Sequence, residues 1–168
     1  VPDDMLLDAA ASGALVTREQ VAEQARRMVA DDKAKQAIVR FYEQWLGLPL
    51  LDSATKDPAA FPMWSDTLRD SMREETRRFI SHVLWEDDAN LATLFTASYS
   101  FVNASLAELY GVSGGPSDDA TFEQMDLDPT QRAGVLTQGA FMSSYANPQF
   151  SSPIKRGKWV RVRMLCQD

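Results

Sequence analysis

Apolar residues recur at helical spacing between residues 34 and 46, and no other feature of the sequence constrains the fold as strongly. They lie three or four positions apart, which places them on one face of a helix. Asp32 stands before them as an N-cap, and Gly47 and Pro49 follow them, as is common just after a helix ends. The apolar stripe consists of Ala34, Ala37, Ile38, Phe41, Trp45 and Leu46. We therefore predict a helix over residues 32–46.

Comparable start and stop signals divide most of the chain into further helices. Thr17 and Gln20 have the spacing of a capping box, and Asp128 followed by Pro129 is a common helix start. The predicted helical segments are 3–12, 17–30, 32–46, 65–85, 89–95 and 103–111, one that opens at Pro129 and one that opens at Pro153. We predict an all-α fold, an irregular bundle of seven or eight helices with one long proline-containing connection.

That connection spans residues 47–64 and holds three prolines, so we predict that it is irregular. Four large apolar side chains should hold it against the core: Leu50, Leu51, Phe61 and Trp64. The end of the chain contains a conflict, because residues 160–164 alternate between apolar and basic like a strand. A lone strand at the end of a helical chain would lack a partner, so we predict a helix there.

Composition and charge exclude several classes of protein. The net charge of -7 argues against nucleic-acid binding as the main role, because phosphate contacts need a basic surface. No apolar run approaches the roughly 18 residues that suggest a membrane span. Residues 151–168 carry five basic residues and one acidic residue, and we expect this tail to dock onto the acidic remainder. The chain begins at Val1 without a signal peptide, so we expect a processed or excised part of a longer protein.

One cysteine and one histidine limit the metal chemistry. Cys166 and His82 together cannot make a Cys/His zinc site, and we predict no metal site. Cys166 has no cysteine to pair with in this chain, so we predict a free, buried thiol.

The best candidates for catalysis lie on the predicted helix 65–85. Glu75 and His82 are seven residues apart, on one face of the helix. A carboxylate and an imidazole in this arrangement could act as an acid/base pair. A solvated helix face with ion pairs such as Glu74 to Arg78 explains the same spacing and is our preferred interpretation. A hydrolase would require Glu75 and His82 to share an open cleft.

Two further candidates lie in the basic tail and concern binding. Arg156 could hold a carboxylate in a two-pronged contact, and an ion pair to the acidic part of the chain explains it equally well. Trp159 could stack on a ligand, although burial in the core is the better prediction for a tryptophan.

Five stretches in a fixed order resemble a bacterial family, the domain of unknown function 1592 of planctomycete and myxobacterial type. Each stretch is short, and the resemblance extends over nearly the whole chain. They are "FYEQWLGL" from Phe41, "MREETRRFI" from Met72, "YSFVNASLAELYGV" from Tyr99, "RAGVLTQGAFM" from Arg132 and "SPIKRGKWVRVRMLC" from Ser152. The resemblance implies that residues 1–128 form the helical domain. Residues 129–168 would then be the N-terminal part of an associated c-type-cytochrome-like module, packed on the first as one unit.

In that family a C-x-x-C-H haem-attachment motif follows this region, and here Cys166 is followed only by Gln167 and Asp168. No haem site and no catalytic residue can therefore be transferred to this chain. The resemblance implies an extracytoplasmic protein with c-type haem in a downstream module of the same protein. Our leading hypothesis is a structural or partner-presenting helical module that is not catalytic by itself. The alternatives are a hydrolase-like domain that uses Glu75 and His82, and an interaction scaffold without a redox link.

Overall fold

The computed structural model describes residues 2–167, and the chain divides into two compact units, residues 1–40 and 41–168. Eight α-helices, three short 3-10 or π-helical segments and a two-stranded sheet occur in the described part of the chain. The prediction of a mostly helical fold with about eight helices is confirmed. The all-α prediction is wrong, because two segments pair as strands.

The first unit contains α1 (Asp4–Ala11), α2 (Arg18–Val29) and the first turns of α3 (Asp32–Leu46). The capping box at Thr17 is present, with Gln20 bonded back to the Thr17 backbone. Arg27 donates two hydrogen bonds to Asp3, 2.7 and 2.8 Å long, and these hold the pKa of Asp3 well below its usual range. The predicted cap of α3 is wrong by one position, since Asp31 rather than Asp32 accepts the Lys33 N–H.

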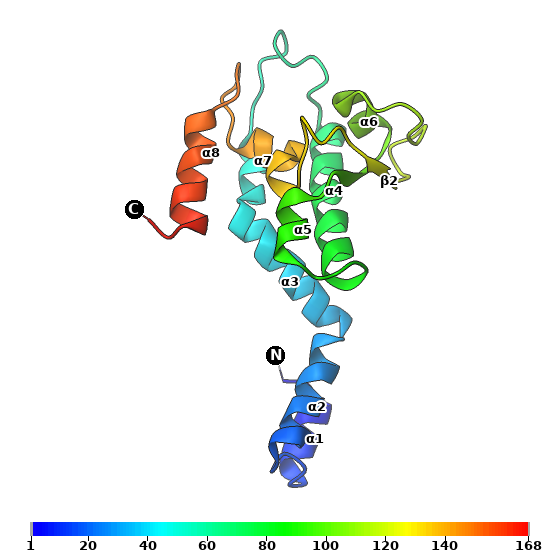
Figure 1. The fold of residues 1–168 in the computed structure, drawn as a ribbon, viewed down its shortest axis with the longest axis vertical. Helices are drawn as coiled ribbons and strands as arrows, with labels where there is room; N and C mark the ends of the chain where they lie inside the picture. Colours follow the sequence, from blue (N-terminus) through cyan, green and yellow to red (C-terminus); the bar gives the residue numbers. More distant parts are fainter. Residues whose placement is uncertain (1, 168) are drawn as a thin grey trace. The chain divides into compact units, whose positions relative to one another are not determined.

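The second unit is built around α4 (Asp66–Trp85), which packs against β1, α5, α6 and α7 (Figure 1). Ser65 caps this helix by accepting the N–H of Leu68. The buried side chains of α4 recur every three or four residues, and the apolar ones are Leu68, Met72, Phe79, Ile80 and Val83. The predicted helix 65–85 is therefore confirmed and forms the centre of this core.

The proline-containing connection is more ordered than predicted. Gly47 ends α3 with φ at 75°, and the segment η1 (Leu48–Ser53) is a 3-10 helix. Leu48 and Leu51 are buried and hold the connection against the core. Leu50 and Phe61, which were predicted to do so, are 48% and 37% exposed. A 3-10 helix has about three residues per turn, so Leu48 and Leu51 lie on the same side. Only that side of the segment reaches the interior.

The sheet pairs β1 (Tyr99–Val102) with β2 (Glu123–Asp126) in antiparallel register, Tyr99 opposite Asp126 and Val102 opposite Glu123. In β1, Ser100 and Val102 are buried while Tyr99 and Phe101 are half-buried, the alternation of a strand. Its partner arrives after the helix α6 (Ala104–Tyr110) and a loop. Asn103 caps α6 and Gly111 ends it at φ 69°, which agrees with the predicted helical segment 103–111.

Of the other two predicted helix starts, the one near residue 89 is confirmed and the one at Pro129 is wrong. The helix predicted from residue 89 is α5 (Leu91–Thr96), capped by Asn90. The helix predicted from Pro129 is wrong, because the carboxylate of Asp128 instead closes a local turn on Thr130. A short 3-10 turn, η2 (Val135–Thr137), follows, and α7 (Gly139–Ser144) begins only after it.

The basic tail is helical, as predicted. It forms α8 (Pro153–Trp159), capped by Ser152, and continues as the π-helical segment η3 (Val160–Met164). Cys166 is exposed, so the prediction of a buried thiol is wrong. Its backbone has left the helix, with φ at 52°. None of the helices of residues 2–167 has the length and apolar character needed to cross a membrane.

Candidate functional site

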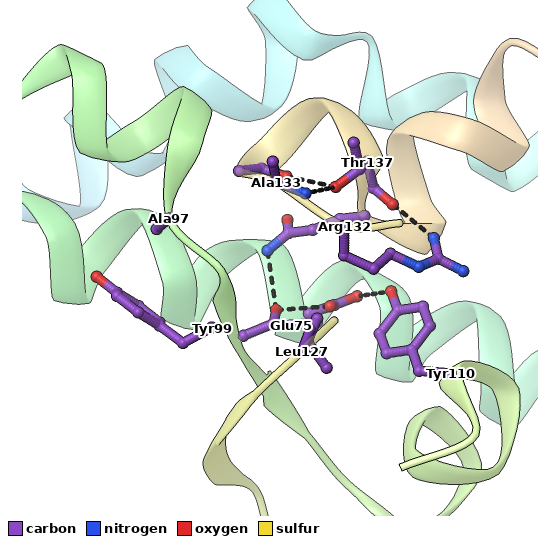
Figure 2. A pocket seen from close by; sticks show the side chains of 11 residues that line it. Glu75, Ala97, Tyr99, Tyr110, Leu127, Arg132, Ala133 and Thr137 are labelled. Atoms are coloured by element: carbon purple, nitrogen blue, oxygen red, sulfur yellow. Dashed lines mark hydrogen bonds between the residues drawn. The ribbon is translucent and has the colours of Figure 1, made fainter. Parts of the chain in front are cut away.

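Glu75 is the most unusual residue of the second unit, because its carboxylate is fully buried in the core. Helix α4 places it there at the spacing of its apolar neighbours Met72 and Phe79. One carboxylate oxygen accepts the hydroxyl of Ser100 at 2.6 Å, and the other accepts the hydroxyl of Tyr110 at 2.7 Å (Figure 2). Strand β1 and helix α6 thus each supply one donor to a single buried charge.

The two hydroxyls are in turn held by residues of the chain near α7. Gln138 donates its side-chain N–H to Ser100 at 3.0 Å and accepts the hydroxyl of Thr76 at 2.9 Å. The backbone N–H of Gly139 donates to the Tyr110 hydroxyl at 2.8 Å. Every donor in this chain of bonds points toward Glu75. We call Glu75, Thr76, Ser100, Tyr110 and Gln138 the Glu75 network.

Burial raises the pKa of Glu75 to about 7, and the hydrogen bonds from Ser100 and Tyr110, together with the positive charge of Arg132, act in the opposite direction. The pKa of Tyr110 is well above its usual value, first through burial and then through the neighbouring charge of Glu75. Arg132 lies over the Tyr110 ring, 4.4 Å from its centre, and donates to the carbonyl of Thr137 at 2.7 Å.

A tight turn holds Arg132 and Gln138 in place. Thr137 accepts the N–H of Ala133 at 2.8 Å and donates its hydroxyl to the carbonyl of Gly134 at 3.0 Å. Gly134 has φ at 61°, and a Cβ at this position would lie 2.2 Å from the carbonyl carbon of Phe95. Only glycine, which has no Cβ, allows the backbone at residue 134 to come this close to the backbone of Phe95.

The space beside the network is very small. A cavity of about 10 Å³ touches Glu75, Ser100, Tyr110, Arg132 and Gln138. That volume suits about one water molecule and excludes an organic substrate. The Glu75 network can therefore hold or release a proton, but it offers no room for a reacting molecule. Among residues 2–167, no group of three or more acidic, histidine or cysteine side chains is arranged to hold a metal ion.

His82 lies two turns along α4 from Glu75, in different surroundings. Its Nδ1 is 3.1 Å from the carboxylate of Glu86, and its ring packs on the edges of Tyr99 and Phe101. His82 does not line the cavity beside Glu75. The structure thus places the two predicted acid/base residues on one helix without bringing their functional groups into one site.

The predicted binding residues are Trp159 and Arg156, and Trp159 lies against the end of α3. The Trp159 side chain is 4% exposed, donates its ring N–H to the carbonyl of Trp45 at 3.1 Å and meets Phe141 edge to face. This contact within the core is the role that burial predicts for a tryptophan. Arg156 is half-buried, and its Nη1 has no hydrogen-bond partner among the described residues.

Five residues of the site were not predicted: Thr76, Ser100, Tyr110, Arg132 and Gln138. One signal was available, because Glu75 occupies a core position of a mostly apolar helix stripe and such a carboxylate needs buried donors. The sequence offers no way to say which of the many hydroxyls supply them.

Comparison with known families agrees with the motifs described above. A model described as PSD4, protein of unknown function (DUF1592), matches residues 1–112, two thirds of the chain. The chain belongs to this family. A second model, PSCyt3, protein of unknown function (DUF1588), matches residues 132–168. Neither the curated proteins nor the solved structures contain a match to this chain.

The two matches lie in the order that the resemblance predicted, and the second name points to an association with cytochromes. The division of residues 1–128 and 129–168 stays a prediction. The compact unit 41–168 contains residues of both matched segments, which is the geometrical fact that bears on function.

Proposed function

We propose that this chain is a structural or partner-presenting helical module of an extracytoplasmic redox protein, joined to a c-type haem module that lies downstream in the same protein. In this role the module is not catalytic by itself. It fixes the position from which the haem module extends and leaves electron transfer to that module.

The observation that carries the proposal is the shared core of the two family segments. Gln138, Gly139 and Trp159 belong to the segment matched by PSCyt3, and they bond to residues of the segment matched by PSD4. Gln138 reaches Thr76 on α4, and Trp159 reaches Trp45 on α3. A segment with a cytochrome-related name is thus built into the helical unit rather than tethered by a linker. Such a junction transmits a fixed orientation, as a shared apolar core does and a flexible linker does not.

The site geometry favours this role over acid/base catalysis. Both carboxylate oxygens of Glu75 are occupied by donors of the chain itself, and the adjoining cavity of about 10 Å³ admits no substrate. A catalytic base must reach the proton that it removes, directly or through one water molecule.

The test is to express the natural full-length protein in a bacterium that matures c-type cytochromes and export it to the periplasm. We expect covalently bound haem, seen as the absorbance of the purified protein, attached at a C-x-x-C-H motif downstream of Asp168. A full-length protein without covalent haem would contradict the proposal.

A second measurement addresses the junction. In the full-length protein, Trp159→Ala should loosen the contact of α8 with α3, so the helical unit and the haem module should become separately cleavable by a protease. Val16→Ala, an exposed change in the first unit, is the matched control. Equal protease resistance of the two variants would argue against a rigid junction.

A further inference from the structure

A second hollow in the unit 41–168 differs in character from the cavity beside Glu75. It has a volume of about 320 Å³ and lies between the loop that leads into α4 and helices α4, α6 and α7. Its walls are mostly apolar and include Phe61, Met63, Trp64, Met72, Leu109 and Met142. This volume is at the low end of small-molecule pockets, which are typically about 300–1,000 Å³ and lined by apolar and aromatic side chains. We call it the Lys56 hollow.

The only charged side chains among the described residues that line this hollow are cations, Lys56 and Arg132. Neither makes an ion pair with a carboxylate within 4.0 Å in the described part of the chain. The chain as a whole has a net charge of -7. Acidic side chains are abundant, and yet none of the described ones is placed against these two cations at that distance.

The ammonium of Lys56 is fixed in position. It donates to the carbonyls of Ser143 and Asn147, at 3.1 and 3.4 Å, and lies over the rings of Phe61 and Trp64. Lys155 donates to the side-chain oxygen of Asn147 at 2.7 Å, so the ammonium groups of Lys56 and Lys155 both bond to Asn147. Burial and the repulsion from Lys155 both lower the pKa of Lys56. An anion at this position would relieve that repulsion and bond to an ammonium that is already oriented.

From these observations we propose that the Lys56 hollow binds a small amphiphilic carboxylate. The carboxylate group binds the ammonium of Lys56, with Lys155 adding positive charge, and the apolar body lies against Met63, Trp64 and Met142. The three methionines of the wall adapt to the shape of an alkyl or aryl body, since their thioether side chains are flexible. This inference is independent of the haem module proposed above.

The experiment uses the whole 168-residue chain with ¹³C-labelled methionine methyl groups. The probes are octanoate, the neutral octanamide and the cationic octylamine, which share one apolar body, and 4-phenylbutyrate as a carboxylate with an aromatic body. We expect the two carboxylates to shift the methyl signals of Met63, Met72 and Met142. The signals of the four methionines outside the hollow serve as internal controls: Met5, Met28, Met125 and Met164. Octanoate should bind about tenfold more tightly than octanamide, because only the carboxylate makes a charge-assisted bond.

Two variants separate the role of charge from that of the apolar wall. Lys56→Leu removes the ammonium and should weaken octanoate about tenfold while leaving octanamide unchanged. Lys33→Leu removes one exposed charge from α3 and should leave both affinities unchanged. The methyl signals of Met125 and Met164 report whether each variant keeps the fold.

Several results would overturn the proposal. They are equal binding of octanoate and octanamide, tighter binding of octylamine, unchanged octanoate affinity in Lys56→Leu, and no shift at Met63, Met72 or Met142 with either carboxylate at millimolar concentration.

Discussion

The unit 41–168 holds two ionisable side chains in contrasting surroundings, Glu75 in the Glu75 network and Lys56 at the Lys56 hollow. Tyr110 and Arg132 line both spaces. Beside Glu75 the space is about 10 Å³ and polar groups close it, while beside Lys56 it is about 320 Å³ and apolar. The carboxyl group of Glu75 has both of its oxygens bonded by the protein's own hydroxyls, whereas the ammonium of Lys56 is held only by carbonyl oxygens and aromatic rings.

The buried stripe of α4 borders both spaces, with Glu75 beside the small cavity and Leu68 and Met72 beside the hollow. A buried charge with a complete set of partners fixes the packing of the elements that supply them, here β1, α6 and the turn before α7. A cation without a carboxylate partner, beside empty apolar space, remains able to meet a ligand. The comparison therefore predicts that changes at Glu75 affect folding and that changes at Lys56 affect binding.

The largest effect is expected for Glu75→Ala. This change leaves the hydroxyls of Ser100 and Tyr110 without their acceptor and opens a void in the core, so it should lower the free energy of unfolding by about 3–5 kcal/mol. Glu74→Ala is the matched control, because Glu74 is partly exposed and pairs with Arg78 on the surface. It should cost less than about 1 kcal/mol. Urea unfolding followed by circular dichroism measures the free energy of unfolding of both variants. Equal losses would show that Glu75 is no more important for stability than a surface carboxylate.

The next effect concerns pH. The ordinary pKa of Glu75 is 4.5 and burial raises it to about 7, so between these values the folded protein holds a proton that the unfolded chain has released. The contribution of Glu75 to stability is therefore fully present below pH 4.5. It should fall by about 3 kcal/mol as the pH rises to 7.

Glu75→Gln isolates this effect, because it keeps the size of the side chain and removes its titration. The charged or titratable groups that face Glu75 are Tyr99, Tyr110 and Arg132; the pKa values of both tyrosines are raised, so none of the three changes its charge in this range. The difference in unfolding free energy between the wild type and the variant should thus depend on pH. A constant difference from pH 4.5 to 7 would show that Glu75 keeps one charge state.

Much of the helical framework could be predicted from the sequence, because its signals are local. The apolar stripe of α4 and the caps at Thr17, Asn103 and Ser152 lie within a few residues of the structure that they determine. The sheet could not be predicted in this way. The alternation of β1 appears in its burial, and β2 reads Glu-Gln-Met-Asp and is a strand through its pairing with β1.

The candidate site shows the same difference between local sequence signals and contacts between distant residues. Glu75 was proposed as a candidate only from its spacing to His82 on one helix face, and the preferred interpretation was a solvated face. That interpretation is wrong for Glu75, which is fully buried. Its partner His82 was chosen by spacing along α4, whereas the bonds of Glu75 go to residues 25 and 35 positions away, Ser100 and Tyr110. The Lys56 hollow was not foreseen, since it joins an irregular loop to three helices and no local pattern links them. Cys166 was predicted to be buried from the general preference of cysteine, and the end of the π-helical segment exposes it.

Tyr110→Phe sharpens the comparison, because Tyr110 lines both spaces. Its hydroxyl serves only the Glu75 network, where it donates to the carboxylate and accepts the N–H of Gly139. Removing it should lower the unfolding free energy by about 2 kcal/mol, the usual range for a hydrogen bond to a charged group. The octanoate affinity should stay within about twofold, since the aromatic ring of this lining residue remains. Tyr99→Phe is the control, with a half-exposed ring whose hydroxyl bonds to Asp87 on the surface.

The smallest effect on stability is expected for Lys56→Leu. Its ammonium is partly withdrawn from water and repelled by Lys155, so the loss of two bonds to carbonyls is largely offset when the charge is removed. The free energy of unfolding should change by less than about 1 kcal/mol, while octanoate binding falls about tenfold. Thermal unfolding with and without octanoate measures both quantities on one sample. A loss of stability as large as that of Glu75→Ala would mean that Lys56 is a second structural charge, and that the two side chains do not differ in role.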